Sequence, residues 1–269
     1  MTLPLRNGFI YNFEVDWGDG TTDFITSFDD PKRVHTYTTL GPNRIIKIRG
    51  VLESWFFNNL GDKEKITRVN NLGILGWLNL DRAFFGCTNL LEFNSNLTDT
   101  SFVTNMSSLF EQNGSLQTVT FSPGFNTSNV TNMSSMFEGT TVLTSLDLFN
   151  FDTSNVTDMS LMFRNTPILA ILNISSFNTS NVTNMASMFQ LASGLNGLDL
   201  THFNTSSVTN MNSMFANTTN LDNLNVTSWD ISAVTNSLDI FLSTSAGLLV
   251  TCDQGGAPGT GTFFGETCM

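Results

Sequence analysis

The chain has 269 residues, a formal net charge of −12 and only 13% charged residues, which is about half the usual share for a soluble protein. This acidic balance, with no basic patch to offset it, argues against nucleic acid and anionic membranes as partners. The first residues, MTLPLRNGFIYNF, lack the pattern of a secretory signal, and no stretch of about 18 apolar residues is present, so we expect no signal peptide and no membrane span.

Residues 1–50 predict a small β-sheet unit. Apolar and polar residues alternate on both sides of Gly18–Gly20, which is the signature of a hairpin, and a second hairpin is predicted around Gly41 and Pro42. The W-G-D-G turn at 17–20, followed by His35 and Tyr37, resembles an abbreviated polycystic-kidney-disease-type domain. We expect Asp19 and His35 to serve that turn and not a metal ion.

Three further regions follow along the chain. The aromatic stretch 51–80 is interpreted as a junction and N-terminal cap, 81–250 as a solenoid, and the Gly-rich 251–269 as a C-terminal cap or tail. Cys87 is expected to be a buried free thiol. Cys252 and Cys268 could close a C-terminal loop, and the sequence leaves open whether they are bonded.

One sequence motif repeats seven times between residues 85 and 241. Its last bulky residue recurs at 25, 27, 26, 26, 26 and 26 residues, starting from Phe85. Such a period indicates stacked coils that bury their apolar faces against one another. The expected packing anchors are Met133, Met159, Met185, Met211, Phe137, Phe163, Phe189 and Phe215.

Each coil of about 26 residues predicts one strand and one helix. Leu146 and Leu148 alternate with polar residues, as in a strand, and strands of successive coils would pair in parallel. Val156, Met159, Met162 and Phe163 then fall at i, i+3, i+6 and i+7, which favours one apolar helical face. We therefore expect an α/β fold: a leucine-rich-repeat-like solenoid of strand-turn-helix coils with a small N-terminal β-sheet unit.

The segment D-T-S-N-V-T-D-M-S-L-M-F at 152–163 carries a family resemblance. It resembles the BspA-like leucine-rich repeats of bacterial surface proteins and the mycoplasma lipoprotein-associated repeat, whose hallmark is D-T-S-x-V-T-x-M-x-x-M-F. Asn replaces the Asp in most copies, as at Asn126, Asn178 and Asn204. The resemblance implies a non-enzymatic surface protein that acts in adhesion or receptor recognition.

The candidate binding residues lie on the strand face that points away from the core. One polar position per coil stands between or beyond the core leucines, and these positions vary between coils where the core positions do not. We expect a shallow, weakly acidic face for a protein or glycan partner, formed by Asp147, Phe149, Asn173, Asp199, His202 and Asn225.

No catalytic motif, cofactor site or metal-ligand spacing is present in the sequence, so we expect no enzyme activity, cofactor or metal. The leading hypothesis is a scaffold displayed on a cell or virion surface. The alternative is a phage or virus structural protein, tail-associated or decorating a capsid, with neighbouring virion proteins as partners. A less favoured hypothesis is ice binding, because the T-S-N-V-T segments form a ladder. That ladder is expected at a strand-to-helix turn, where helix capping already explains it.

Overall fold

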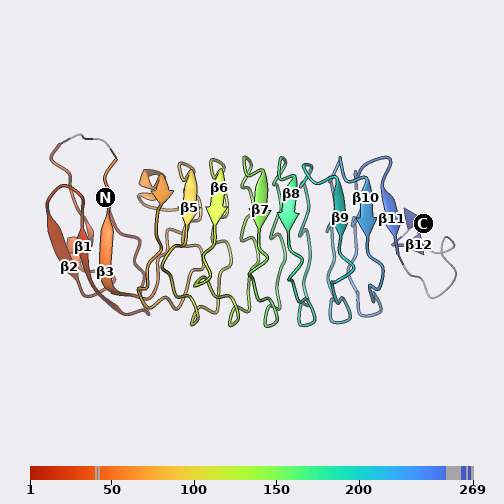
Figure 1. The fold of residues 1–269 in the computed structure, drawn as a ribbon, viewed down its shortest axis with the longest axis horizontal. Coiled ribbons are helices and arrows are strands. Elements are labelled where there is room, and N and C mark those ends of the chain that lie inside the picture. The colour runs from red at the N-terminus through yellow and green to blue at the C-terminus, as the bar shows by residue number, and fades with distance from the viewer. Residues whose placement is uncertain (40, 42, 253–261, 265, 268–269) are drawn as a thin grey trace.

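A computed structural model describes the chain except for residues 40, 42, 253–261, 265 and 268–269. An antiparallel sheet of three strands stands at one end, and a single row of coils extends from it along the long axis of the molecule (Figure 1). Successive coils place their short strands side by side and in parallel. The repeat therefore builds a rod-shaped solenoid.

The N-terminal sheet has the order β2-β1-β3, with β1 at Tyr11–Asp16, β2 at Thr22–Ile25 and β3 at Lys47–Leu52. Its first hairpin is confirmed: β1 and β2 pair antiparallel across a turn in which Gly18 and Gly20 have φ of 75° and 90°. The second predicted hairpin is wrong. Among the described residues of this region, β3 is the only strand, and it pairs with β1, whereas Val34 bridges to Thr2 near the chain start.

The solenoid strands are three residues long or shorter. They are β4 (Arg68–Val69), β5 (Glu92–Asn94), β6 (Thr118–Thr120), β7 (Ser145–Asp147), β8 (Ile171–Asn173), β9 (Gly197–Asp199), β10 (Asn223–Asn225) and β11 (Leu249–Thr251). They pair as β4-β5-β6, β7-β8 and β9-β10-β11. In β7 the central Leu146 is buried while both flanking residues are exposed, as the alternation predicts. Two short strands, β12 (Thr262–Phe263) and β13 (Glu266–Thr267), form a separate antiparallel pair.

The predicted helix in each coil is wrong, and the fold is a β-solenoid. Among the described residues, the helical segments are two 3-10 turns, Pro31–Arg33 and Lys63–Lys65, and neither lies in a repeat. In the M-x-x-M-F element, backbone N–H groups that donate to the next coil alternate with N–H groups that donate within their own coil. Met133 and Ser135 donate their N–H groups to the next coil, to the carbonyls of Asp158 and Ser160, at 3.0 and 2.9 Å. Met136 donates back within its own coil to Met133 at 3.3 Å.

This alternation has a conformational cause. The same position in each coil takes a positive φ, 55° at Ser135, 62° at Leu161 and 54° at Ser187, and such a residue ends a right-handed helix. Val, Thr, Asn and Ser also have lower helix propensity than Ala or Leu. Backbone bonds between coils thus replace the bonds that a helix would make within one segment.

The core is a stack of aromatic rings that runs through the coils. Phe110, Phe137 and Phe163 lie nearly parallel, with ring centroids 5.6 and 6.0 Å apart, and the stack continues through Phe189 to Phe215. At its N-terminal end the stacked ring is Phe84, at 6.0 Å from Phe110. The expected first anchor, Phe85, is therefore off by one residue. All eight expected Met and Phe anchors of the later coils have 0% exposure.

Buried threonines tie neighbouring coils together. In each D/N-T-S segment the Thr hydroxyl donates to a carbonyl of the next coil, as from Thr153 to Asn178 and from Thr179 to Asn204, both at 2.9 Å. Thr153 also accepts from the Asn178 N–H at 2.8 Å. Thr100, Thr127 and Thr205 repeat the donation to the next coil. The segment that the sequence predicts as a helix cap instead links neighbouring coils by hydrogen bonds.

Candidate functional site

Four of the predicted binding residues occupy one row at the ends of the strands. We call this the strand-end row; it consists of Asn94, Thr120, Asp147, Asn173, Asp199 and Asn225, which pair in register between strands wherever the strands are joined. The side chain of Asp147 accepts from the N–H of Phe149 at 3.0 Å, and Asp199 accepts from Thr201 at 3.1 Å. Each such side chain closes the turn that follows its own strand.

The row also has contacts between coils. Asn173 donates from Nδ2 to Oδ1 of Asp147 at 2.9 Å, and its own Oδ1 accepts from the hydroxyl of Ser175 at 2.8 Å. Asn225 similarly accepts from the hydroxyl of Thr227 at 2.7 Å. The polar atoms of this row therefore already serve the turn in part, and a partner would use their remaining lone pairs and N–H groups.

Phe149 and His202 complete the predicted set and differ in their contacts. The Phe149 ring is 59% exposed, whereas its equivalents in the next coils are Ser175 and Thr201. His202 Nε2 lies 3.0 Å from the carbonyl oxygen of Ile174, one coil back, and the ring stands edge-on to Phe203 at 4.9 Å. The structure thus brings Asp147 and Asn173 together, while Phe149 and His202 lie two coils apart.

Two more rows repeat the same turn chemistry. The first lies before the buried threonines and consists of Asp99, Asn126, Asp152, Asn178, Asn204 and Asp230, each of which accepts from the N–H two residues on. The second consists of Asn105, Asn132, Asp158, Asn184, Asn210 and Asn236, with the same acceptor role. Hydrogen bonds from Ser101 lower the pKa of Asp99, and those from Ser232 lower the pKa of Asp230.

In none of the three rows do two aspartates occupy adjacent coils. Asn and Asp accept the turn bond equally well, so the turn does not select between them. Carboxylates in neighbouring coils would be about 5 Å apart, where like charges repel. The observed distribution of Asp and Asn avoids this repulsion, and it becomes visible in the sequence only when the coils are aligned.

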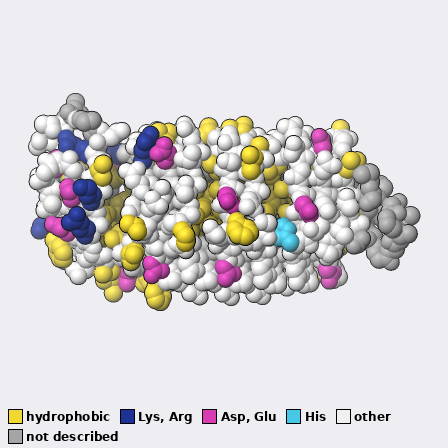
Figure 2. Space-filling view, viewed as in Figure 1, with side chains coloured by type: hydrophobic (Ala, Val, Ile, Leu, Met, Phe, Trp, Pro, Cys, Tyr) yellow, Lys and Arg dark blue, Asp and Glu magenta, His cyan; other side chains and the backbone are white. Residues whose placement is uncertain are grey.

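Charge is divided unevenly between the two parts of the molecule. Residues 1–82 hold ten of the 11 Lys and Arg residues and ten of the 23 Asp and Glu residues, so that this part is neutral. Residues 83–269 hold Arg164 and 13 acidic residues, and they account for the whole net charge of −12. Figure 2 shows blue side chains gathered over the N-terminal end, and acidic side chains scattered over a mostly uncharged solenoid.

The ladder of exposed threonines is more regular than the sequence indicated. Thr131, Thr157 and Thr183 are exposed, and each donates its hydroxyl to the carbonyl of the preceding Thr at 3.2 to 3.3 Å. Thr104, Thr209 and Thr235 extend the row to six. Because no helix follows, helix capping does not account for these residues.

The sequence makes predictions about membrane spans, metal sites and cysteines. In the part of the chain that the structure describes, no helix has the length and apolarity to cross a membrane, and no three His, Cys, Asp or Glu side chains gather as a metal site. Cys87 is a buried free thiol, as predicted, and burial raises its pKa far above the usual range. Cys268 lies outside the described residues, so the structure does not describe whether Cys268 is bonded to Cys252.

In the N-terminal unit, the residues of the W-G-D-G and H-x-Y motifs meet. His35 stacks on the buried ring of Trp17 at 4.7 Å, and its Nε2 lies 2.8 Å from Oδ2 of Asp19. Tyr37 donates its hydroxyl to the carbonyl of Trp17 at 3.0 Å. Asp19 also accepts from the N–H of Thr21, so it serves the turn as expected.

The fold and its rows define a β-solenoid repeat protein with one short strand per coil. The family described as "Mycoplasma protein of unknown function, DUF285" matches residues 78–171 and again residues 144–247. These two matches together span more than half of the chain, so the protein belongs to this family. No curated protein matches it. The matches leave out the N-terminal unit, whose likeness to a polycystic-kidney-disease-type domain stays a prediction, as does the BspA-like assignment.

Proposed function

We propose that the protein is a non-catalytic scaffold that recognises a protein or glycan partner through the strand-end row and the residues beside it. The observation that carries the proposal is the contrast between inward and outward positions. The anchors are the same in consecutive coils, while the outward position two residues past the strand-end row changes from Phe149 to Ser175 to Thr201. An exposed aromatic ring beside polar groups is typical of a recognition surface.

Display on a cell surface or a virion is part of this proposal. The surface of the solenoid supports it, because most of its side chains are uncharged hydrogen-bonding groups, with scattered acidic residues among them, and such a surface suits contact with polar partners. The alternative is a virion structural protein. It would use the same strand-end row and the residues beside it, and its partners would be neighbouring virion proteins.

The test replaces surface residues without disturbing the turns. Phe149→Thr introduces the residue found at the equivalent place in the β9 coil, and Asp199→Asn keeps the acceptor for Thr201. The double variant is expected to lose at least tenfold in binding to the glycans or proteins that the parent protein binds in an array screen. Asn181→Ser, which copies Ser207 of the next coil on a different row, is the matched control and should bind as the parent does. Unchanged binding by the double variant would remove this face from consideration.

Ice binding is a second candidate, favoured by the row of six exposed threonines. Hydroxyls held at one spacing of about 4.8 Å can order water on a flat face. Thermal hysteresis of the purified protein measures this directly. Activity that disappears in Thr157→Lys would support ice binding, and a zero reading for the parent protein rejects it.

A further inference from the structure

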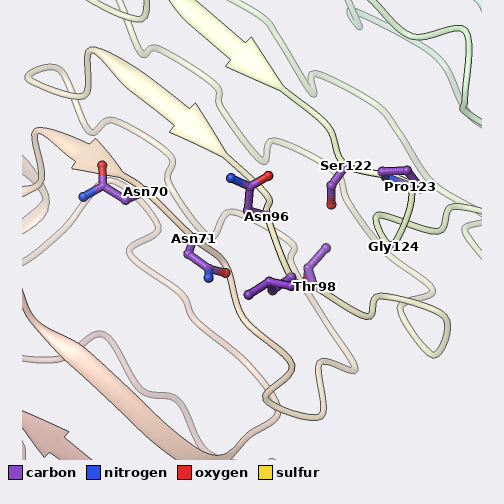
Figure 3. A pocket seen from close by; sticks show the side chains of 8 residues that line it. Asn70, Asn71, Asn96, Thr98, Ser122, Pro123 and Gly124 are labelled. Atoms are coloured by element: carbon purple, nitrogen blue, oxygen red, sulfur yellow. The ribbon is translucent and has the colours of Figure 1, made fainter.

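A depression of about 460 Å³ opens where the turns after β4, β5 and β6 meet, a volume within the range of small-molecule sites. Figure 3 shows its side chains arriving from these three neighbouring turns. Asn70 and Asn71 come from the first turn, Asn96 and Thr98 from the second, and Ser122 from the third. It is separate from the binding residues predicted on β7 to β10.

The depression exists because one ring of a second aromatic column is missing. Thr98 stands four residues after Asn94, at the place taken in later coils by Phe151, Phe177, Phe203 and Trp229, which are buried. Phe93 supplies a ring on the inner side instead, edge-on to Phe125 at 6.5 Å. The surface above Thr98 is left unfilled.

The turn after β6 adds to the hollow. It has one residue more than the equivalent turn after β7, and the extra length is taken up by Ser122, Pro123 and Gly124. Gly124 passes close to the neighbouring chain: a Cβ there would lie 2.1 Å from the carbonyl oxygen of Thr98. Any other residue would push this turn away, so glycine keeps the two walls of the depression in place.

The lining is neutral and rich in hydrogen-bonding groups that are not in use. The side-chain amides of Asn70 and Asn96 bond to no residue that the structure describes. Asn71 uses its Oδ1 to accept from Gly73 at 2.8 Å, which leaves its two amide N–H groups. Thr98 is 5% exposed, and its Oγ1 has no partner among the described residues.

The rim adds apolar surface. Leu97, which is 74% exposed and has a φ of 49°, and Pro123 stand beside the amides. Asp, Glu, Lys, Arg and His are missing from the lining residues. The lining therefore favours a ligand that is uncharged, carries several donors and acceptors, and offers C–H surface to Leu97 and Pro123. A pyranose ring has these properties.

We propose that this depression binds a neutral saccharide unit. Asn70, Asn71 and Asn96 hydrogen-bond its hydroxyls, and Leu97 contacts a C–H face of the ring. The proposal stands apart from recognition by Phe149 and Asp199, so that each can fail without the other.

The test uses saturation-transfer NMR with the whole chain and six named probes. Methyl β-glucoside, methyl β-galactoside, N-acetylglucosamine and lactose are the neutral set, with glucuronic acid and N-acetylneuraminic acid as charged counterparts. At least one neutral probe should give a signal and the acids should not. Silence from all four neutral probes, or equal signals from the acids, would overturn the proposal.

Two variants locate the binding. Asn96→Trp fills the depression and should reduce affinity at least tenfold. Ser206→Trp, an exposed position in the turn after Asn204 and outside both proposed sites, should leave the affinity unchanged. Asn70→Ala removes one exposed amide with little risk to folding and should weaken binding roughly three- to tenfold, the value of one or two hydrogen bonds. If Asn96→Trp and Asn70→Ala both bind the sugar as tightly as the parent does, the sugar binds elsewhere and the proposal is contradicted.

Discussion

Asn173 donates a 2.9 Å hydrogen bond to Asp147 and lies one coil from Asp147 on one side and from Asp199 on the other. It therefore separates two carboxylates with a neutral amide that also stabilises one of them. The order Asp, Asn, Asp on successive coils recurs at Asp99, Asn126 and Asp152.

Asn173→Asp would place three carboxylates on adjacent coils. Two new repulsions of about 1 kcal/mol each at about 5 Å in water-like surroundings, together with a lost hydrogen bond of about 1 kcal/mol, should lower the free energy of unfolding by about 2–3 kcal/mol. Urea unfolding at low salt measures this, and 1 M NaCl should restore part of it. The control Asn94→Asp keeps Thr120 as its neighbour and should change little. Equal effects from both variants would refute the repulsion argument.

Thr153→Val tests the hydrogen bonds that link neighbouring coils. The replacement keeps the shape of the buried Thr153 side chain but removes the part-buried bonds of 2.9 and 2.8 Å to the carbonyl and the N–H of Asn178. We expect a loss of about 1–3 kcal/mol in unfolding free energy. Thr157→Val removes a hydroxyl from an exposed position and should cost less than 1 kcal/mol. A reversed order of the two variants in chemical denaturation would count against the buried threonines as structural links between coils.

Cys87 should resist thiol reagents in the folded protein. Its side chain has 0% exposure, and burial raises its pKa, so that little thiolate forms at neutral pH. Iodoacetamide labelling followed by peptide mass spectrometry should modify Cys87 only in denaturant. Stoichiometric labelling in native buffer would show that the first coils open readily.

Asp19 should make the N-terminal unit sensitive to acid. Hydrogen bonds from Thr21 and His35 lower its pKa from 3.8 to about 2, so that its ionised form stabilises the folded state. That contribution is present above pH 4 and is lost as pH falls toward 2. Calorimetric Tm values at pH 5, 3 and 2 should converge for the parent and Asp19→Asn at the lowest pH. If the difference in Tm between the parent and Asp19→Asn stays the same from pH 5 to pH 2, the stabilisation does not depend on the charge of Asp19.

The strands and the packing anchors could be predicted from the sequence, because alternation around Leu146 and the 26-residue period have direct spatial meanings. The helix could not be rejected in this way. Three-residue spacing from Val156 to Met159 to Met162 fits a helical face and also fits a run of tight turns. The positive φ of Leu161, which decides between them, falls on a residue type that gives no sign of it.

The sequence predicts the strand-end row but not the depression beside Thr98. The strand-end row follows from strand period alone, so Asp147, Asn173, Asp199 and Asn225 were found together. The depression beside Thr98 cannot be predicted in this way, because it depends on an absent ring and an added residue, and both appear only when the first coils are superposed on the later ones. Circular dichroism offers a simple check of the corrected fold: a β-type spectrum without helical minima.

The interchange of Asn and Asp at the turns has a consequence for how such a protein can evolve. The codons of these two residues differ by a single base, and the turn tolerates either, so each row can gain or lose a negative charge in one mutational step without refolding. Substitution of Asn by Asp is disfavoured only at positions that have an Asp at the equivalent place in a neighbouring coil. Homologous proteins could thus adjust their surface potential to new environments while the backbone stays the same.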